Sequence, residues 1–155
     1  MGFSIPGVCQ CFNSGSVDGA EAPLPSGLFL LCQRSESKEQ SFRFQVGVSG
    51  NPAYVEVKSV SLVKQGQGRF PDAPTKRGVK HVKGLMELCA KGYQAVVVFV
   101  SQRSDTRSIT CNDDVDPVFG EWLRKALDEG VELYGMNCKV TPTTISLNKE
   151  VEVIL

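Results

Sequence analysis

The central part of the chain carries hydrophobic residues with the periodicity of β-strands. Polar and apolar positions alternate over residues 42–48 and 53–63, and the intervening run SGNP favours a turn. Residues 94–102 differ, because a continuous apolar run, AVVVFV, lies at their centre. Such a run is typical of a strand covered on both faces. The pattern therefore predicts a hairpin and, later in the chain, a buried strand.

Two further segments have the three- and four-residue spacing of amphipathic helices. The first, residues 77–91, is followed by Gly92 as a C-terminal stop. Its apolar stripe consists of Val79, Val82, Leu85, Met86, Leu88 and Cys89. The second has Asp116 as its N-cap, Pro117 in its first turn and Gly130 at its end. We expect its inward face to comprise Val118, Phe119, Trp122, Leu123, Ala126 and Leu127.

Three more runs of strand length follow, at residues 131–140, 144–147 and 151–155, and we expect the last two to form a terminal hairpin. The resulting order, β-β-α-β-α-β-β-β, predicts an α/β fold with a mixed β-sheet flanked by helices. At 155 residues and 41% hydrophobic content, the chain is long enough for one core and does not call for two full domains.

Residues 1–32 differ in composition from the rest of the chain. They are rich in Gly, Ser and Pro, and the first basic residue is Arg34. We expect this segment to be poorly structured and the folded domain to comprise residues 33–155. The segment lacks the basic start of a secretory signal, and the apolar run GLFLLC is too short to span a bilayer. No membrane association is predicted.

Cysteine and charge content narrow the class of protein. The six cysteines include no C-x-x-C pair, which argues against a zinc site and is typical of a reduced, intracellular protein. The 17 Lys and Arg residues balance 17 Asp and Glu residues. Any affinity for a polyanion must therefore come from uneven placement of charge along the chain.

Basic residues are concentrated between Lys64 and Lys91. This stretch has seven Lys or Arg and two acids, Asp72 and Glu87, and it contains the single histidine, His81. A solvated helix face would account for part of this pattern. However, RFPDAPTKRGVKH places two prolines, a glycine and four bases in a loop that leads directly into a helix. A helix N-terminus beneath basic side chains is suited to anions, so phosphate binding is the competing interpretation.

The stretch YVEVK, residues 54–58, places an acid and a base two residues apart in a predicted strand. Side chains alternate faces along a strand, so Glu56 and Lys58 share one face. A turn centred between residues 50 and 51 would set Gln45 opposite Glu56 and Arg43 opposite Lys58. Either this polar face is solvated, as in an edge hairpin, or its groups are buried and satisfied by partners.

Four runs together resemble one protein family. They are YVEVKSVSLV, GRFPDAPTKRGVKHVKGLMEL, KGYQAVVVFVSQRSD and NDDVDPVFGEWLRKALDEGVEL. From residue 36 to residue 155 the chain is similar to the C-terminal domain of the sugar fermentation stimulation protein family, SfsA. The resemblance implies DNA binding and a restriction-endonuclease-like core of the PD-(D/E)xK type. Family members carry an OB-like domain before this one, and we expect this chain to hold the second domain alone, since residues 1–32 lack the strands of an OB barrel.

The resemblance also implies roles for individual residues. Glu56 and Lys58 match the E-x-K of the nuclease-like core, in which the acid helps to hold a divalent metal such as Mg²⁺ and the lysine stabilises charge on phosphate. Glu36 matches an upstream glutamate of the family. Gln45 stands where the family pattern has an aspartate, and an amide in place of a carboxylate weakens Mg²⁺ binding. A metal site formed by Glu36, Gln45 and Glu56 is therefore expected to be degenerate.

Two functions follow from these expectations. The first is a non-catalytic DNA-binding module with a residual E-x-K face. Its contacts to backbone phosphates would come from Arg69, Lys76, Arg77, Lys80, His81, Lys83 and Arg103. The alternative is a Mg²⁺-dependent phosphodiesterase that uses Glu56 and Glu36 as metal ligands and Lys58 as the stabilising cation.

Overall fold

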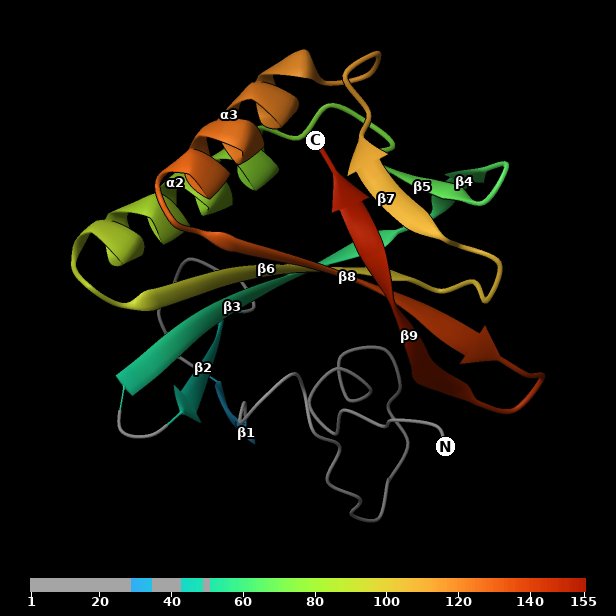
Figure 1. Ribbon diagram of the computed structural model, residues 1–155, viewed down its shortest axis with the longest axis horizontal. Coiled ribbons are helices and arrows are strands. Elements are labelled where there is room, and N and C mark those ends of the chain that lie inside the picture. The colour runs from blue at the N-terminus through green and yellow to red at the C-terminus, as the bar shows by residue number, and fades with distance from the viewer. Residues whose placement is uncertain (1–28, 35–42, 49–50) are drawn as a thin grey trace.

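The computed structural model describes residues 29–34, 43–48 and 51–155. Their strands form one nine-stranded sheet, in the order β1-β2-β3-β6-β8-β9-β7-β5-β4, with two helices packed on it (Figure 1). In chain order the elements are β1 (Phe29–Arg34), β2 (Arg43–Val48), β3 (Asn51–Val60), β4 (Leu62–Lys64), β5 (Gln67–Phe70), α2 (Lys76–Ala90), β6 (Gln94–Ser101), β7 (Ser108–Cys111), α3 (Pro117–Asp128), β8 (Glu132–Val140) and β9 (Ile145–Ile154).

The sheet is mixed, as the order of elements predicts. β6 pairs in parallel with β3 and β8, whereas β2 and β3 are antiparallel, as are β8 and β9. The predicted α/β class is confirmed. Of the segment expected to be poorly structured, residues 1–28 lie outside the described residues, and residues 29–32 belong to β1.

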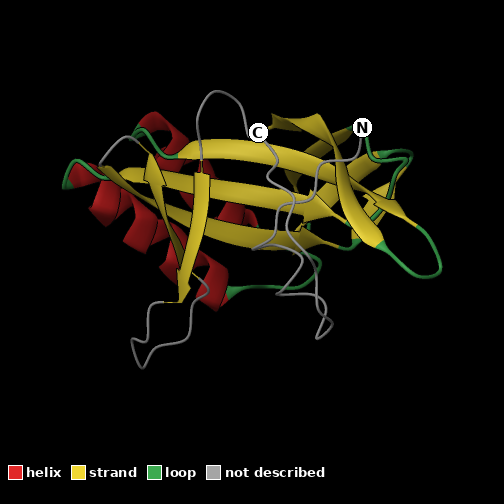
Figure 2. Cartoon of the chain, turned by 90° about the horizontal axis from the view of Figure 1, so that it is seen from below, coloured by secondary structure: helices red, strands yellow, loops and turns green. Residues whose placement is uncertain are grey.

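The central strand β6 is buried on both faces, in agreement with its continuous apolar sequence. Ala95, Val97 and Phe99 belong to the main core, together with Leu85 of α2 and Phe119 of α3. The alternate residues of β6 pack in two smaller apolar clusters on the opposite face. Figure 2 shows both helices on one side of the sheet. Side chains of β3 and β6 that point to this side therefore lie beneath the helices.

The two helices start within one residue of their predicted positions. Thr75 caps α2 by accepting a hydrogen bond from Gly78 N at 2.9 Å, and Asp116 caps α3 by accepting one from Phe119 N at 3.0 Å. The other carboxylate oxygen of Asp116 accepts from Thr75 N at 2.7 Å, which ties the starts of the two helices together. Within the part of the chain that the structure describes, no helix is long and apolar enough to cross a membrane.

The buried face of α3 is narrower than its apolar stripe predicts. Val118 and Leu127, which the pattern assigns to the inward face, are 52% and 47% exposed. The core is met instead by Phe119, Leu123 and Ala126, which recur at spacings of four and three residues. The prediction is wrong for Val118 and Leu127 because they lie at the two margins of a stripe that α2 and the sheet cover only at its centre.

The hairpin of β2 and β3 has a different register from the predicted one. Arg43 pairs with Glu56 and Gln45 pairs with Tyr54, so Gln45 is not opposite Glu56. Val48 pairs with Asn51, which places the turn one residue earlier than predicted and shifts every pair by two positions. A shift of two residues preserves the face on which each position lies.

The sheet curls where β3 ends. Only Ser61 separates β3 from β4, and β4 returns as β5 through Gln65 and Gly66, whose φ angles are 52° and 80°. Positive φ at both positions is the geometry of a two-residue I′ hairpin turn. β5 then pairs in parallel with β7, which pairs with β9. The predicted strand at 53–63 is thus two strands. The strands β5 and β7 are too short for the apolar pattern to predict them, since QGRF has one large apolar residue and SITC alternates over only four positions.

The C-terminal residues form one strand, β9, and not the predicted hairpin. Polar residues interrupt the apolar pattern at its centre, where the β8–β9 register shifts between Asn137 and Cys138. Asn137 Oδ1 accepts hydrogen bonds from Lys149 N at 3.0 Å and from Asn148 Nδ2 at 3.1 Å. The polar residues therefore form hydrogen bonds at a β-bulge, and β9 continues through it as one strand.

Candidate nucleic-acid interface

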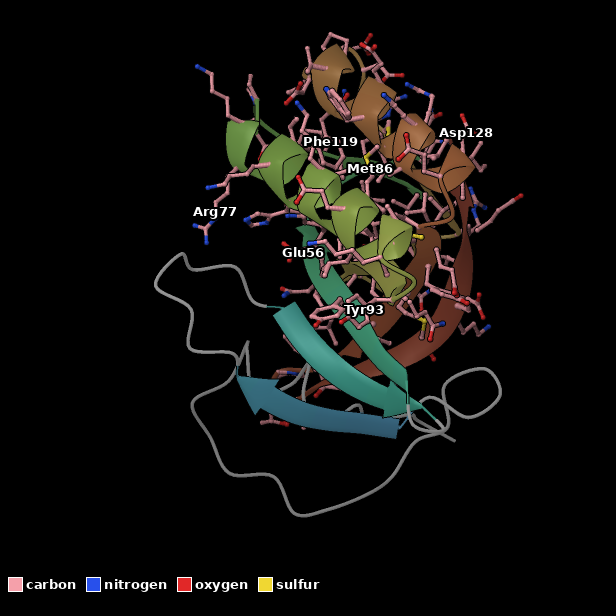
Figure 3. The ribbon with its side chains drawn as sticks, turned by 90° about the vertical axis from the view of Figure 1, so that its left-hand side faces the viewer. Glu56, Arg77, Met86, Tyr93, Phe119 and Asp128 are labelled. Atoms are coloured by element: carbon pink, nitrogen blue, oxygen red, sulfur yellow. The ribbon has the colours of Figure 1, made fainter. Side chains whose placement is uncertain are left out.

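Glu56, Lys58 and His81 form a charged cluster between β3 and α2. Glu56 and Lys58 lie on the face of β3 that carries Tyr54 and Val60, both of which pack in the main core beneath the helices. Figure 3 shows Glu56 where β3 passes next to α2. Glu56 Oε1 lies 2.9 Å from Lys58 Nζ and 2.6 Å from His81 Nδ1. The acid and base of YVEVK are therefore paired, and a residue from the helix joins them.

The hydrogen bonds of this cluster fix the state of the histidine ring. A carboxylate only accepts, so Nδ1 of His81 donates to Glu56 and the neutral ring carries its proton on Nδ1. Lys58 Nζ is also 3.2 Å from Nδ1. Since Nδ1 is already a donor, that contact is a close approach of two donors that share one acceptor oxygen.

Burial decides the charge of His81. The side chains of Lys58, His81 and Glu56 are 12%, 9% and 6% exposed. Burial lowers the pKa of His81 below its usual value, and Lys58 and Arg77 lower it further, against the raising effect of Glu56. The ring is therefore neutral at pH 7, and the Glu56 charge is compensated chiefly by Lys58.

His81 thus occupies a different place from the one that the sequence suggests. The pattern of bases groups it with the DNA-contacting cations, but the structure buries it against Glu56. Helical spacing provides a signal for this position, because His81 lies three residues after Gly78 and four before Leu85, and all three are buried.

The second carboxylate oxygen of Glu56 is able to accept a hydrogen bond or bind a cation. Oε2 is buried and has no hydrogen-bond partner among the residues that the structure describes. Leaving a buried acceptor unpaired costs roughly 1–3 kcal/mol. This oxygen is consistent with one ligand position for a hard cation, which prefers carboxylate oxygens.

The remaining ligands that a metal would need are not supplied by the described residues. No group of three or more His, Cys, Asp or Glu side chains that could hold a metal occurs within residues 29–34, 43–48 and 51–155. Glu36 lies outside the described residues, and the side chain of Gln45 is likewise outside them. At the backbone level, the position opposite Glu56 is occupied by Arg43.

Most of the predicted phosphate-contacting cations lie exposed on α2. Lys76, Arg77, Lys80 and Lys83 are all exposed, and the first turn of the helix contains no acid. Figure 3 shows Arg77 at the start of α2, on the side of the molecule where Glu56 lies. Lys83 Nζ is 3.8 Å from the centroid of the Trp122 ring, which holds this ammonium against α3.

Arg69 and Arg103 are separate from the helix. Arg69 is half-buried on β5, and its Nη1 lies 3.6 Å from Asp114 Oδ2. Arg103 follows β6 and makes two hydrogen bonds to the Asp105 carboxylate, at 2.8 and 2.7 Å. This pairing raises the pKa of Arg103 and lowers that of Asp105. Arg103 is therefore already matched by an acid.

Known proteins share the sequence and fold of this chain. The model of the SfsA family, described as the sugar fermentation stimulation protein RE domain, matches residues 28–144. A sugar fermentation stimulation protein homolog from Moorella thermoacetica is 46% identical over 114 residues, which are 74% of this chain and 49% of the relative. The homolog from Caldanaerobacter subterraneus is 42% identical over 123 residues, which are 76% of this chain and 54% of the relative.

A solved structure shares the fold. The structure of Pyrococcus furiosus SfsA in complex with Ca²⁺ superposes with a TM-score of 0.75 at 23% identity, over 84% of this chain and 57% of that one. The chain spans about half the length of the curated relatives that it matches. Because the family model covers most of its residues, the chain belongs to the sugar fermentation stimulation protein (SfsA) family.

Proposed function

We propose that this chain binds DNA without sequence preference, through contacts between backbone phosphates and the exposed cations of α2. The observation that carries the proposal is the row formed by Lys76, Lys80 and Lys83, with Arg77 beside it, on a helix whose first turn has no acid. Spacings of four and three residues place such side chains along one helix face. Their charges add to the positive end of the helix dipole.

The kind of contact determines the kind of recognition. Lysine and arginine contacts to phosphate position a protein on DNA but carry no sequence information. Each phosphate neutralised releases counterions, so binding should weaken steeply as salt is raised. We therefore propose binding that is salt-dependent and tolerant of sequence.

The state of the E-x-K cluster favours binding over catalysis. Glu56 Oε1 is engaged by Lys58 and His81, and Glu56 is the single carboxylate of this cluster within the described residues. Gln45 stands where the family pattern has an aspartate, so a metal site in this chain would have one negatively charged ligand fewer. In the proposed function this cluster supports the packing of α2 on β3, and the surface of α2 holds the DNA.

Charge reversal tests the proposal. Arg77→Glu combined with Lys80→Glu should weaken binding of a fluorescent duplex at least about a hundredfold, measured by anisotropy at fixed salt. Lys139→Glu is the matched control, because Lys139 is exposed at the β8–β9 hairpin, away from α2 (Figure 1). Unchanged affinity in the double variant, with its fold intact by circular dichroism, would refute the α2 surface.

A second candidate function is Mg²⁺-dependent phosphodiester hydrolysis, favoured by the buried Oε2 of Glu56, which has no hydrogen-bond partner among the described residues. A bound Mg²⁺ would polarise a phosphoryl oxygen and activate water. Glu56 and Glu36 would be its carboxylate ligands, and Lys58 would stabilise negative charge on the phosphate.

Metal binding separates the two candidates without relying on activity. Under the binding-only proposal, calorimetry should detect Mg²⁺ association with Gln45→Asp and far weaker association with the natural chain. Tight Mg²⁺ binding by the natural chain, together with plasmid nicking that Glu56→Gln abolishes, would favour the phosphodiesterase instead.

A further inference from the structure

A basic hollow lies at the turn between β4 and β5, where β7 begins. It has a volume of about 720 Å³ and is lined by Lys64, Arg69, Arg107, Ser108 and the turn residues 65–67. These lining residues include three cations and no carboxylate. Like charges brought together repel one another, so such a lining is stabilised when an anion enters.

Arg107 is held in place by the β4–β5 turn. Its Nη2 donates to Gln65 O at 2.9 Å, and its backbone N donates to Gly66 O at 2.7 Å. The guanidinium packs so closely on the turn that a Cβ added to Gly66 would lie 2.9 Å from Arg107 Nε. The φ of 80° at Gly66 disfavours a side chain, and a Cβ at this position would displace the Arg107 guanidinium. The hydrogen bond to Gln65 O orients the exposed Arg107 guanidinium, which reduces the conformational entropy that it would lose on binding a ligand.

Arg69 contributes donors that the described residues leave largely unused. Its contact with Asp114 is long, at 3.6 Å, and the Asp114 side chain is 88% exposed. An ion pair of this kind contributes little, about 0–1 kcal/mol. Arg69 Nε is buried and has no hydrogen-bond partner among the described residues. A stronger acceptor in the hollow would compete well with Asp114 for the exposed side of this guanidinium.

The strand register aligns the other polar groups of the hollow. Gln67 of β5 pairs with Lys64 of β4 on one side and with Ser108 of β7 on the other. Residues paired across adjacent strands lie on the same face of the sheet. An ammonium, an amide and a hydroxyl therefore form a row across three strands, next to the two guanidinium groups. The row continues on β9 with Glu152, which pairs with Ser108 but does not line the hollow. Phosphate oxygens accept hydrogen bonds from donor groups of these kinds.

We propose that the hollow binds a terminal phosphate group, a phosphomonoester dianion. A phosphomonoester carries about −1.5 to −2 charges at pH 7, whereas a phosphodiester within a DNA strand carries one. Three cations without a lining carboxylate match the dianion better. The site goes beyond the proposed DNA-binding function, because it lies on β4, β5 and β7 and includes none of the α2 cations.

The test compares two single-stranded oligonucleotides of one sequence, with a 5′-phosphate or a 5′-hydroxyl. The natural chain should bind the phosphorylated strand roughly tenfold more tightly, by anisotropy, and Lys64→Ala or Arg107→Ala should reduce this ratio to about one. Arg107→Lys should keep part of the preference, because it retains the charge, and Lys139→Ala should keep all of it. Equal affinity of the natural chain for both strands, or a ratio that survives Arg107→Ala, would overturn the proposal.

Titration with inorganic phosphate identifies the source of the ligand and locates the site. Phosphate at millimolar concentration should shift the amide resonances of residues 64–67 and 107–108 in the natural chain, and not in Lys64→Ala. If phosphate produces these shifts and the 5′-phosphate preference is absent, the site takes free phosphate and the strand-end proposal is wrong. The Arg77→Glu/Lys80→Glu variant should give the same phosphate shifts as the natural chain, so failure of the α2 surface and failure of the hollow can be told apart.

Discussion

The cluster between β3 and α2 and the hollow at the β4–β5 turn both gather cations, but the cluster has a buried carboxylate at its centre, whereas no carboxylate lines the hollow. In the cluster, Glu56 accepts from Lys58 and His81 within a nearly dry space, where the side chains are 6–12% exposed. In the hollow, Lys64, Arg69 and Arg107 line an open space without a carboxylate. The cluster completes its ion pairing inside the fold. In the hollow, Arg69 has only a long contact of 3.6 Å with the exposed Asp114, so a ligand can pair much of the positive charge.

This difference predicts how each region responds to substitution. Removing a partner from a buried cluster leaves a charge or donor without compensation, which destabilises the fold. Removing a cation from an open hollow relieves repulsion and exposes nothing, so stability changes little and ligand affinity changes most. Substitutions in the cluster should therefore mainly lower the stability of the fold, and substitutions in the hollow should mainly lower its affinity for a ligand.

The largest loss of stability is expected from Glu56→Ala. This substitution leaves Lys58 buried without its counter-charge, and the free energy of unfolding should fall by roughly 3–5 kcal/mol in urea denaturation. Glu56→Gln is the matched control, because it keeps the size of the side chain and an acceptor oxygen, and it should cost less. A loss below about 1 kcal/mol for Glu56→Ala would show that the cluster is not a buried ion pair in solution.

A smaller loss is expected when the helix is uncoupled from the cluster. His81→Leu removes the hydrogen bond to Glu56 and should lower the free energy of unfolding by about 1–3 kcal/mol. His81→Asn places an amide N–H near the position of Nδ1 and should recover part of that loss. Equal stability of the Leu and Asn variants would contradict the assigned role of the Nδ1 donor.

The hollow should show almost no effect on stability. Lys64 is exposed, and Lys64→Ala should change the free energy of unfolding by no more than about 0.5 kcal/mol while reducing the preference for a 5′-phosphate. Denaturation and strand binding, measured on the same preparation, check both halves of this prediction. A large destabilisation would mean that Lys64 has a structural role and would remove the contrast with Glu56.

The least perturbing test of burial uses a thiol of the main core. Burial raises the pKa of Cys111 to about 11. Since the thiolate is the nucleophile, Cys111 should react with iodoacetamide at pH 8 roughly a hundredfold more slowly than an ordinary cysteine, and unfolding in urea should restore its rate. Peptide mapping by mass spectrometry follows Cys111 alone. Equal rates in the folded and unfolded protein would show that this part of the core is open.

The elements with strong local signals could be predicted from the sequence. The spacing of apolar residues and the cap at Asp116 define α3 to within two residues, and the run AVVVFV identifies β6 as a doubly covered strand. β5 and β7 could not be predicted, because each is four residues long and is stabilised by pairing with strands distant in sequence. Local propensity contains no information about such long-range pairs.

The candidate site could be predicted only in part. The sequence indicates that Glu56 and Lys58 share a face, and the structure confirms that they are in contact. The sequence does not indicate that His81 is the third member of this cluster. A histidine among lysines suggests a position on the surface, and only the packing of α2 on β3 shows that His81 is buried. The hollow was not predictable, since Lys64 and Arg107 lie far apart in sequence and meet through the β5–β7 pairing.

The central claim is that the cations of α2 hold DNA through its phosphates, and the salt dependence of duplex binding tests it most directly. The logarithm of the association constant should fall linearly with the logarithm of salt concentration, and the slope should become shallower by about 0.9 in Lys80→Ala and by a similar amount in Lys76→Ala. Lys139→Ala should leave the slope unchanged. If Lys76→Ala and Lys80→Ala both retain the slope of the natural chain, α2 does not contact the phosphates and the account is contradicted.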